Sequence, residues 1–286
     1  MSVVTGSIKI ANNTDDEFRA WGLWISDALT TAGIPKTADS GQVDWGTVTK
    51  AATQYTAAGY EIRRFNDALQ ATAPVYFKIE FGAGHPDVTA PSIWITIGTG
   101  SDGAGVITGP NTSRIQVHCL AGTANFPARF SGDASGFAVS LQGGNASSAI
   151  ALVMERTHAW NGTDTNLGAL FLCTTTSGSA WRQTVYLFDG GSQIVEANIG
   201  ALFPTGTTAS DGVNTMFMPV YPNVGVMLNP FVGAVGAFKN NLTESASLTL
   251  THYGVSRQYF ANPTTHFNSF GSRGDATHMT FLMRDW

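Results

Sequence analysis

Charged residues are scarce in this sequence. They make up 12% of the 286 residues, with 15 Lys and Arg against 20 Asp and Glu, which is about half the share usual in a soluble domain. The net charge of −5 leaves no basic stretch long enough to neutralise a nucleic-acid backbone. We therefore expect no nucleic-acid partner, and a low-charge exterior that suits packing against copies of the chain or other proteins.

Long apolar runs are missing as well. The richest run, residues 224–238, is interrupted by Asn229, Pro230 and three glycines, so we expect no helix that spans a membrane. The first residues lack a basic region followed by an apolar core, and we expect no secretion signal. Cysteine is nearly absent, and Cys119 and Cys173 lie in strand-like runs, where we expect buried free thiols and no disulfide.

The clearest helix pattern covers residues 14–32. Thr14 and Glu17 have the spacing of a capping box, and Gly33 and Pro35 end the pattern. A stripe of apolar side chains follows the helical period. Its members are Phe18, Trp21, Ile25, Ala28 and Leu29.

This stripe has two interpretations. The helix packs on a sheet of its own chain, or it is an attachment helix that docks on a neighbouring subunit. The second interpretation makes Phe18, Trp21, Ile25 and Leu29 interface candidates. A second helix is also predicted over residues 45–58, although four threonines weaken it.

The sequence period changes from helical to alternating after Gly59. In residues 75–81 the apolar side chains alternate with Tyr76, Lys78 and Glu80, a pattern typical of a half-buried antiparallel strand. Further strand-like runs with turn sequences between them follow at 93–97, 114–120, 137–141, 149–156, 169–174, 182–188, 193–199, 226–228, 247–253, 259–260 and 279–284. The sequence thus predicts a mainly β fold, an antiparallel β-sandwich or barrel with an N-terminal helix.

A soft boundary near Gly109 and Pro110 divides the chain. Residues 1–110 would form an attachment module of helix and strands, and residues 111–286 a β-sandwich-like module.

Gly98, Gly100 and Gly103 match the G-x-G-x-x-G pattern of a dinucleotide site. The residues that follow them are extended, whereas such a site must open a helix. We therefore expect a glycine-rich hairpin with Asp102 in its turn and no nucleotide. The six histidines are widely spaced, so no metal and no other cofactor is expected.

Two tryptophans are candidates for stacking on a sugar ring. Trp94 is expected on the face of its strand that is opposite to the face of the isoleucines. Trp181 follows a loop of small residues. Burial in the core or in a subunit interface is the competing interpretation of both. A glycosidase would need two facing carboxylates, for which the sequence offers Asp133, Glu155, Asp189 and Glu196 without any local motif.

Three segments carry a resemblance to a known class of proteins. They are the helix Asp-Glu-Phe-Arg-Ala-Trp-Gly-Leu-Trp-Ile-Ser-Asp-Ala-Leu at 16–29, Ala-Asp-Ser-Gly-Gln-Val-Asp-Trp at 38–45, and Gly-Tyr-Glu-Ile-Arg-Arg-Phe-Asn-Asp at 59–67. Together they resemble the openings of structural proteins of tailed bacteriophages, over residues 1–110 only.

The resemblance implies a non-enzymatic structural component of a virion. It does not define the part of the particle, which could be the tail, baseplate, fibre or capsid surface, and we expect the tail, baseplate or fibre. Such a protein folds in the bacterial cytoplasm and is then built into the particle in several copies, with other virion proteins as partners. Two alternatives stay open. In the first, the chain is a host glycan-binding module of the same particle. In the second, it is a depolymerase of host polysaccharide.

Overall fold

The structure is a computed structural model. It describes residues 2–9, 14–84, 91–118, 125–141, 150–158, 164–177, 180–188, 194–198, 216–220, 223–224, 227–228, 231–238, 247–252, 254–261 and 279–286. The chain is mainly β, as predicted, and all strand pairs found among these residues are antiparallel.

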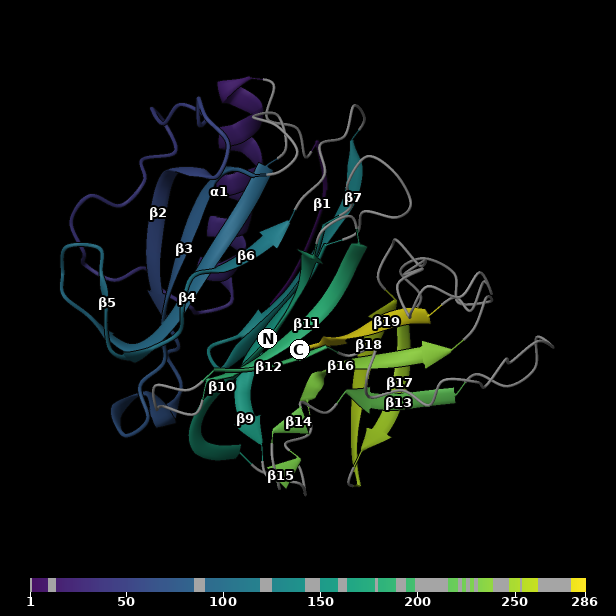
Figure 1. The fold of residues 1–286 in the computed structure, drawn as a ribbon. Coiled ribbons are helices and arrows are strands. Elements are labelled where there is room, and N and C mark those ends of the chain that lie inside the picture. Colours follow the sequence, from purple (N-terminus) through teal and green to yellow (C-terminus); the bar gives the residue numbers. More distant parts are fainter. Residues whose placement is uncertain are drawn as a thin grey trace.

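Three larger sheets make up the fold (Figure 1). The central sheet has the order β1 (Ser2–Ile8), β7 (Phe126–Asp133), β8 (Gly136–Leu141), β9 (Ile150–His158), β10 (Asp164–Ser177), β11 (Ala180–Phe188) and β12 (Ile194–Asn198). The N-terminal sheet has the order β2 (Thr56–Arg64), β3 (Tyr76–Ala83), β4 (Pro91–Ser101) and β5 (Ile107–Asn111), and β6 (Ile115–His118) also pairs with β4.

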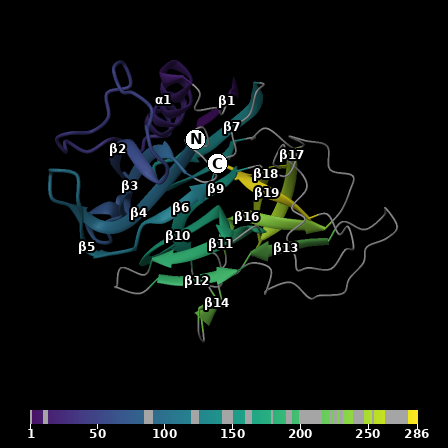
Figure 2. The same cartoon turned by 45° about the horizontal axis from the view of Figure 1, so that its top comes forward.

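The C-terminal sheet has the order β13 (Met216–Val220), β16 (Phe231–Phe238), β19 (Met279–Asp285), β18 (Val255–Ala261) and β17 (Ser247–His252). A small ribbon joins β14 (Asn223–Val224) to β15 (Met227–Leu228), and a 3-10 turn, η1, covers Ala68–Ala71. In both views the central sheet lies between the N-terminal and C-terminal sheets (Figures 1 and 2).

Helix α1 (Asp15–Thr31) forms where the capping box predicts it. The Thr14 side chain accepts a hydrogen bond from the backbone N–H of Glu17 at 3.1 Å, and Gly33 follows the helix with a φ of +86°, a conformation that favours glycine. The second predicted helix, over residues 45–58, is wrong. Those residues form turns and bends and then enter β2. Trp45 is buried in the core.

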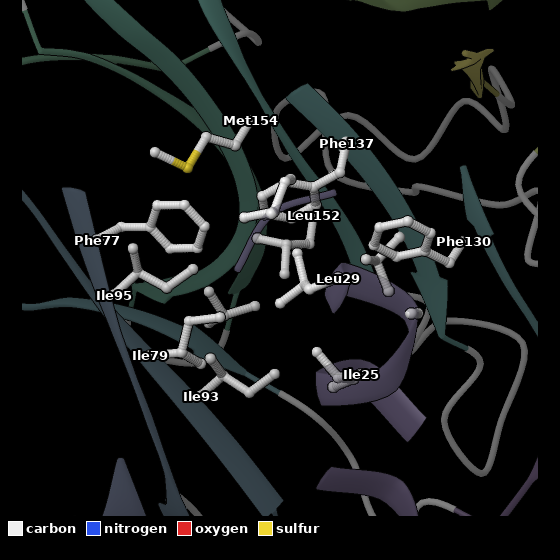
Figure 3. Close-up of a cluster of buried hydrophobic side chains, with 14 of the residues drawn as sticks. Ile25, Leu29, Phe77, Ile79, Ile93, Ile95, Phe130, Phe137, Leu152 and Met154 are labelled. Carbon is white, nitrogen blue, oxygen red and sulfur yellow. The ribbon is translucent and has the colours of Figure 1, made fainter. Parts of the chain in front are cut away.

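One apolar core lies between α1, the N-terminal sheet and one face of the central sheet (Figure 3). The predicted alternation in β3 is confirmed, because Phe77, Ile79 and Phe81 are buried in this core and the residues between them are partly exposed. The same core holds Leu29 from the first hundred residues and Phe137 from beyond them. One cluster of buried residues thus contains side chains from both sides of residue 110.

The other face of the central sheet is covered by the C-terminal sheet. Ser131 and Ala138 are buried on that face, and the ring of Trp286 lies so close to Gly136 that a side chain there would meet it. The backbone N–H of Trp286 donates to Ser131 Oγ at 2.6 Å. The central sheet thus has both of its faces covered in this region.

Candidate functional site

The four interface candidates on α1 are core residues. Phe18 and Leu29 are 0% exposed, and Trp21 and Ile25 are 1% exposed. The Trp21 ring lies 5.6 Å from the ring of Phe81, which belongs to β3. This corrects the interface prediction, because the stripe is covered by sheets of its own chain, as the first of the two interpretations has it.

Trp94 is not available for stacking on a sugar. It is 3% exposed, and the Arg114 guanidinium lies over its ring, 4.1 Å from the ring centre. Arg114 is held there by Glu80, whose carboxylate accepts a hydrogen bond from Nε at 2.7 Å. The glycan-stacking prediction is therefore wrong for Trp94 in this structure. Trp181 lies in β11 opposite Thr176, and its side chain lies outside the described residues.

The glycine motif forms the predicted hairpin. Gly98 and Gly100 lie in β4, which runs antiparallel to β5, and Gly103 sits in the connecting turn with a φ of +78°. The carboxylate of Asp102 accepts hydrogen bonds from the backbone of this turn, including the Ala104 N–H at 2.8 Å. The extended chain that follows rules out the helix on which a pyrophosphate would rest.

Of the four carboxylates considered for a glycosidase, the structure describes the side chains of Asp133 and Glu155, which both belong to the central sheet and both pair with Gly136 of β8. Asp133 caps the turn between β7 and β8 by accepting from Ser135, and Glu155 is buried in β9 with 1% exposure. Asp189 and the side chain of Glu196 lie outside the described residues. Within the part of the chain that the structure describes, no three His, Cys, Asp or Glu side chains gather in a way that would hold a metal ion.

The most concentrated chemistry is a buried charge cluster between α1 and β2. Glu61 and Arg63 are both 0% exposed, and they share one face of β2 because they are two residues apart in a strand. The Arg63 guanidinium donates to Glu61 Oε2 through Nε at 2.9 Å and through Nη2 at 2.7 Å. This pair was not predicted from the sequence, although opposite charges at positions i and i+2 of a strand share one face and are a usable signal.

Both members of the cluster are fully provided with hydrogen bonds. Glu61 Oε1 accepts from Ser26 Oγ at 2.7 Å and Trp45 Nε1 at 2.8 Å, and it pairs with Lys36 Nζ at 2.6 Å. Arg63 also donates to the Ser26 carbonyl at 2.9 Å. Burial by itself raises the pKa of Glu61, but Arg63 and these donors outweigh it, so the pKa lies below its ordinary value.

A second buried carboxylate joins two loops. Asp39 accepts hydrogen bonds from Ser101 Oγ at 2.6 and 2.7 Å, from the Gly105 N–H at 3.2 Å and from Thr37 Oγ1. Burial by itself raises the pKa of Asp39, but these hydrogen bonds hold it below its ordinary value. The segment after α1 is thereby fixed to the turn between β4 and β5.

Two further ion pairs join the layers. Arg156 in β9 donates to both oxygens of Asp67, at 2.5 and 2.7 Å, and to the Ala73 carbonyl at 2.6 Å. Arg129 in β7 pairs with Asp285 in β19 at 2.6 Å. The first pair connects the central sheet to the segment between β2 and β3, and the second connects it to the C-terminal sheet.

No protein-family model matches this sequence, and no curated protein matches it. Among the residues described, no helix has the length and apolar character needed to cross a membrane.

Proposed function

We propose that the chain is a non-enzymatic structural component of a tailed-phage virion, in its tail, baseplate or fibre, present in several copies and in contact with other virion proteins. The resemblance of residues 1–110 and the low content of charge support this proposal. The mainly β fold is compatible with it, although a fold by itself does not define a function.

The observation that carries the proposal is that several of the few charged residues form buried or half-buried ion pairs inside the protein. Glu61 with Arg63 connects β2 to α1 through Ser26. Asp67 with Arg156 connects the segment after β2 to the central sheet, and Arg129 with Asp285 connects the central sheet to the C-terminal sheet. Buried and half-buried ion pairs resist separation, because an uncompensated charge is left behind when one partner moves. A protein that works by holding a shape under load needs layers that do not slide.

Particle purification tests the proposal. Virions from a lysate of the phage that encodes the chain are banded by density, and their proteins are identified by mass spectrometry. We expect the chain to band with the particles and to be labelled on their surface or tail by a specific antibody. Recovery only from the soluble part of the lysate would contradict the proposal.

The non-enzymatic part of the proposal has its own test. The purified chain is incubated with host capsule or lipopolysaccharide, and new reducing ends are measured. We expect none above a heat-inactivated control. Released oligosaccharide that disappears when one of Asp133, Glu155, Asp189 or Glu196 is replaced would establish the depolymerase alternative instead.

A further inference from the structure

Strand β1 forms one edge of the central sheet. It pairs with β7 from Ser2 opposite Gly132 to Ile8 opposite Phe126, and no other strand pairs with it in the residues that the structure describes. Backbone N–H and C=O groups point alternately to the two sides of a strand. About half of those in β1 therefore point away from β7, along the free edge.

This edge lacks the features by which proteins block an edge strand. Its sequence, Ser-Val-Val-Thr-Gly-Ser-Ile, has no charged residue and no proline. Val3 is 46% exposed, and Thr5 and Ser7 are exposed beside it. Among the described residues, no backbone group outside β7 forms a hydrogen bond with the backbone of β1, and the strand carries only small and apolar side chains.

The chain protects a comparable edge elsewhere. Along β2, the backbone N–H groups of Thr37 and Val43 donate to the carbonyls of Ile62 and Tyr60 at 2.9 and 2.8 Å. Gln42 Oε1 accepts from the Ile62 N–H at 2.8 Å. The edge of β2 is thus occupied by a segment of its own chain, in contrast to that of β1.

Strand β1 is also held in place from its inner side. Ser2 Oγ donates to the Thr31 carbonyl at the end of α1 at 2.9 Å, the Trp24 ring lies against Gly6, and Ile8 is buried. A strand fixed in this way loses little conformational freedom when another strand pairs with it.

We propose that the free edge of β1 binds β1 of a second copy of the chain, antiparallel and about a two-fold axis. In such a pair the residue on the two-fold axis meets its own symmetry mate, so a charged residue there would face a like charge. Strand β1 carries none, and Lys9 just beyond it is paired with Glu17. Full pairing of Ser2–Ile8 places Thr5 opposite Thr5 and joins two central sheets into one.

Sedimentation velocity of the purified chain tests the pairing. We expect a monomer–dimer equilibrium and, for Thr5→Lys, a dimer dissociation constant raised at least about tenfold, because two ammonium groups meet at the axis. The matched control is Thr249→Lys, at an exposed position of β17, the edge strand of the C-terminal sheet. Circular dichroism verifies that both variants are folded.

Cross-linking gives a second measurement, which decides the matter even if Thr5→Lys does not fold. Under oxidation, Thr5→Cys should form a covalent dimer and Thr249→Cys should not, because opposed residues of paired strands come within disulfide reach. A wild-type chain that is monomeric at all soluble concentrations, or association lost in Thr249→Lys but kept in Thr5→Lys, would overturn the proposal. Neither result bears on whether the chain is part of a virion, since particle purification answers that separately.

Discussion

Glu61 and Arg63 are buried together in an apolar layer, where each charge alone would cost several kcal/mol in lost hydration. The pair is tolerated because the carboxylate and the guanidinium form hydrogen bonds with each other, with Ser26, and with further partners that include Trp45 and the Ile34 carbonyl. The arrangement also fixes the distance and rotation of α1 against β2, since Ser26 belongs to the helix.

Replacing one member should therefore be costly. We expect Glu61→Gln to lower the free energy of unfolding by about 3–5 kcal/mol, because Arg63 is left buried without a counter-charge. Urea denaturation measures this change. Glu80→Gln is the control, since its partner Arg114 is 38% exposed, and it should cost no more than about 1 kcal/mol. Equal effects of the two substitutions would contradict this description of the cluster.

Acid should destabilise the fold through the same carboxylates. The pKa values of Glu61 and Asp39 are lowered in the folded chain from ordinary values of 4.5 and 3.8. The unfolded chain therefore takes up these protons first as the pH falls. Their contribution to stability is fully present above pH 4.5 and is lost at lower pH, as the pH falls through the folded pKa values.

The measurement is the free energy of unfolding over a pH series. Wild type should lose stability steadily below pH 4.5, and Asp39→Asn should show a shallower slope because one linked proton is removed. An unchanged slope in Asp39→Asn would mean that Asp39 does not have a lowered pKa.

At the scale of elements, α1 is shaped by one glycine. Gly22 lies in the middle of the helix, where glycine costs about 1 kcal/mol relative to alanine. Its position is explained by Trp45, because a Cβ at residue 22 would overlap the indole ring. The loop after the helix is thus packed directly on the helix backbone.

Gly22→Ala should lower the melting temperature although alanine is the better helix former. The reason is the overlap with Trp45, and forced overlap in a packed core costs about 1–3 kcal/mol. In a Trp45→Ala background, the same substitution should become neutral or stabilising. A stabilising effect of Gly22→Ala in the wild-type background would show that the ring moves aside easily.

A second pair of variants distinguishes a core helix from an attachment helix. Trp21→Ala should cost about 3–5 kcal/mol of stability, as is usual for a buried aromatic side chain. Leu23→Ala, on the exposed side of the same helix at 40% exposure, should stay within about 0.5 kcal/mol. Thermal unfolding of both measures the difference, and a stable Trp21→Ala that fails only to associate would restore the interface interpretation.

The sequence pattern predicts some of these elements and not others, and the reasons are physical. The helix bounds and the alternation in β3 follow from local residues, and both were predicted correctly. The partner of the Phe18 stripe was not predictable, because an apolar stripe has the same spacing whether it covers its own sheet or a neighbour. Strand β1 was missed because Ser-Val-Val-Thr-Gly-Ser-Ile has no regular alternation.

The side-chain contacts of the candidate site were even harder to predict than the elements, because they depend on pairing between distant strands. Trp94 contacts Arg114 because β4 pairs with β6 as well as with β3. The sequence of one strand alone does not determine the register of either pairing. The same holds for Asp67 with Arg156, which are 89 positions apart. Local spacing indicates which residues share a strand face, and long-range register decides what covers them.

At the scale of the whole molecule, the central sheet is the layer to which the others are fixed. Arg129→Met should loosen the C-terminal sheet in particular, since Arg129 pairs with Asp285 and also lies over the ring of Phe260, 4.4 Å from its centre. Hydrogen exchange should become faster in β18 and β19 and stay unchanged in β3 and β4. Arg114→Met, at the surface of the N-terminal sheet, is the control and should leave β18 and β19 protected.

The central claim is that this chain works as a repeated building block of a phage particle. Cryo-electron microscopy of purified virions tests it most directly. We predict density in the tail, baseplate or fibre that fits α1 and the three sheets in several symmetry-related copies. If the chain is found neither as such density nor among the proteins of particles whose genome carries its gene, the claim is contradicted.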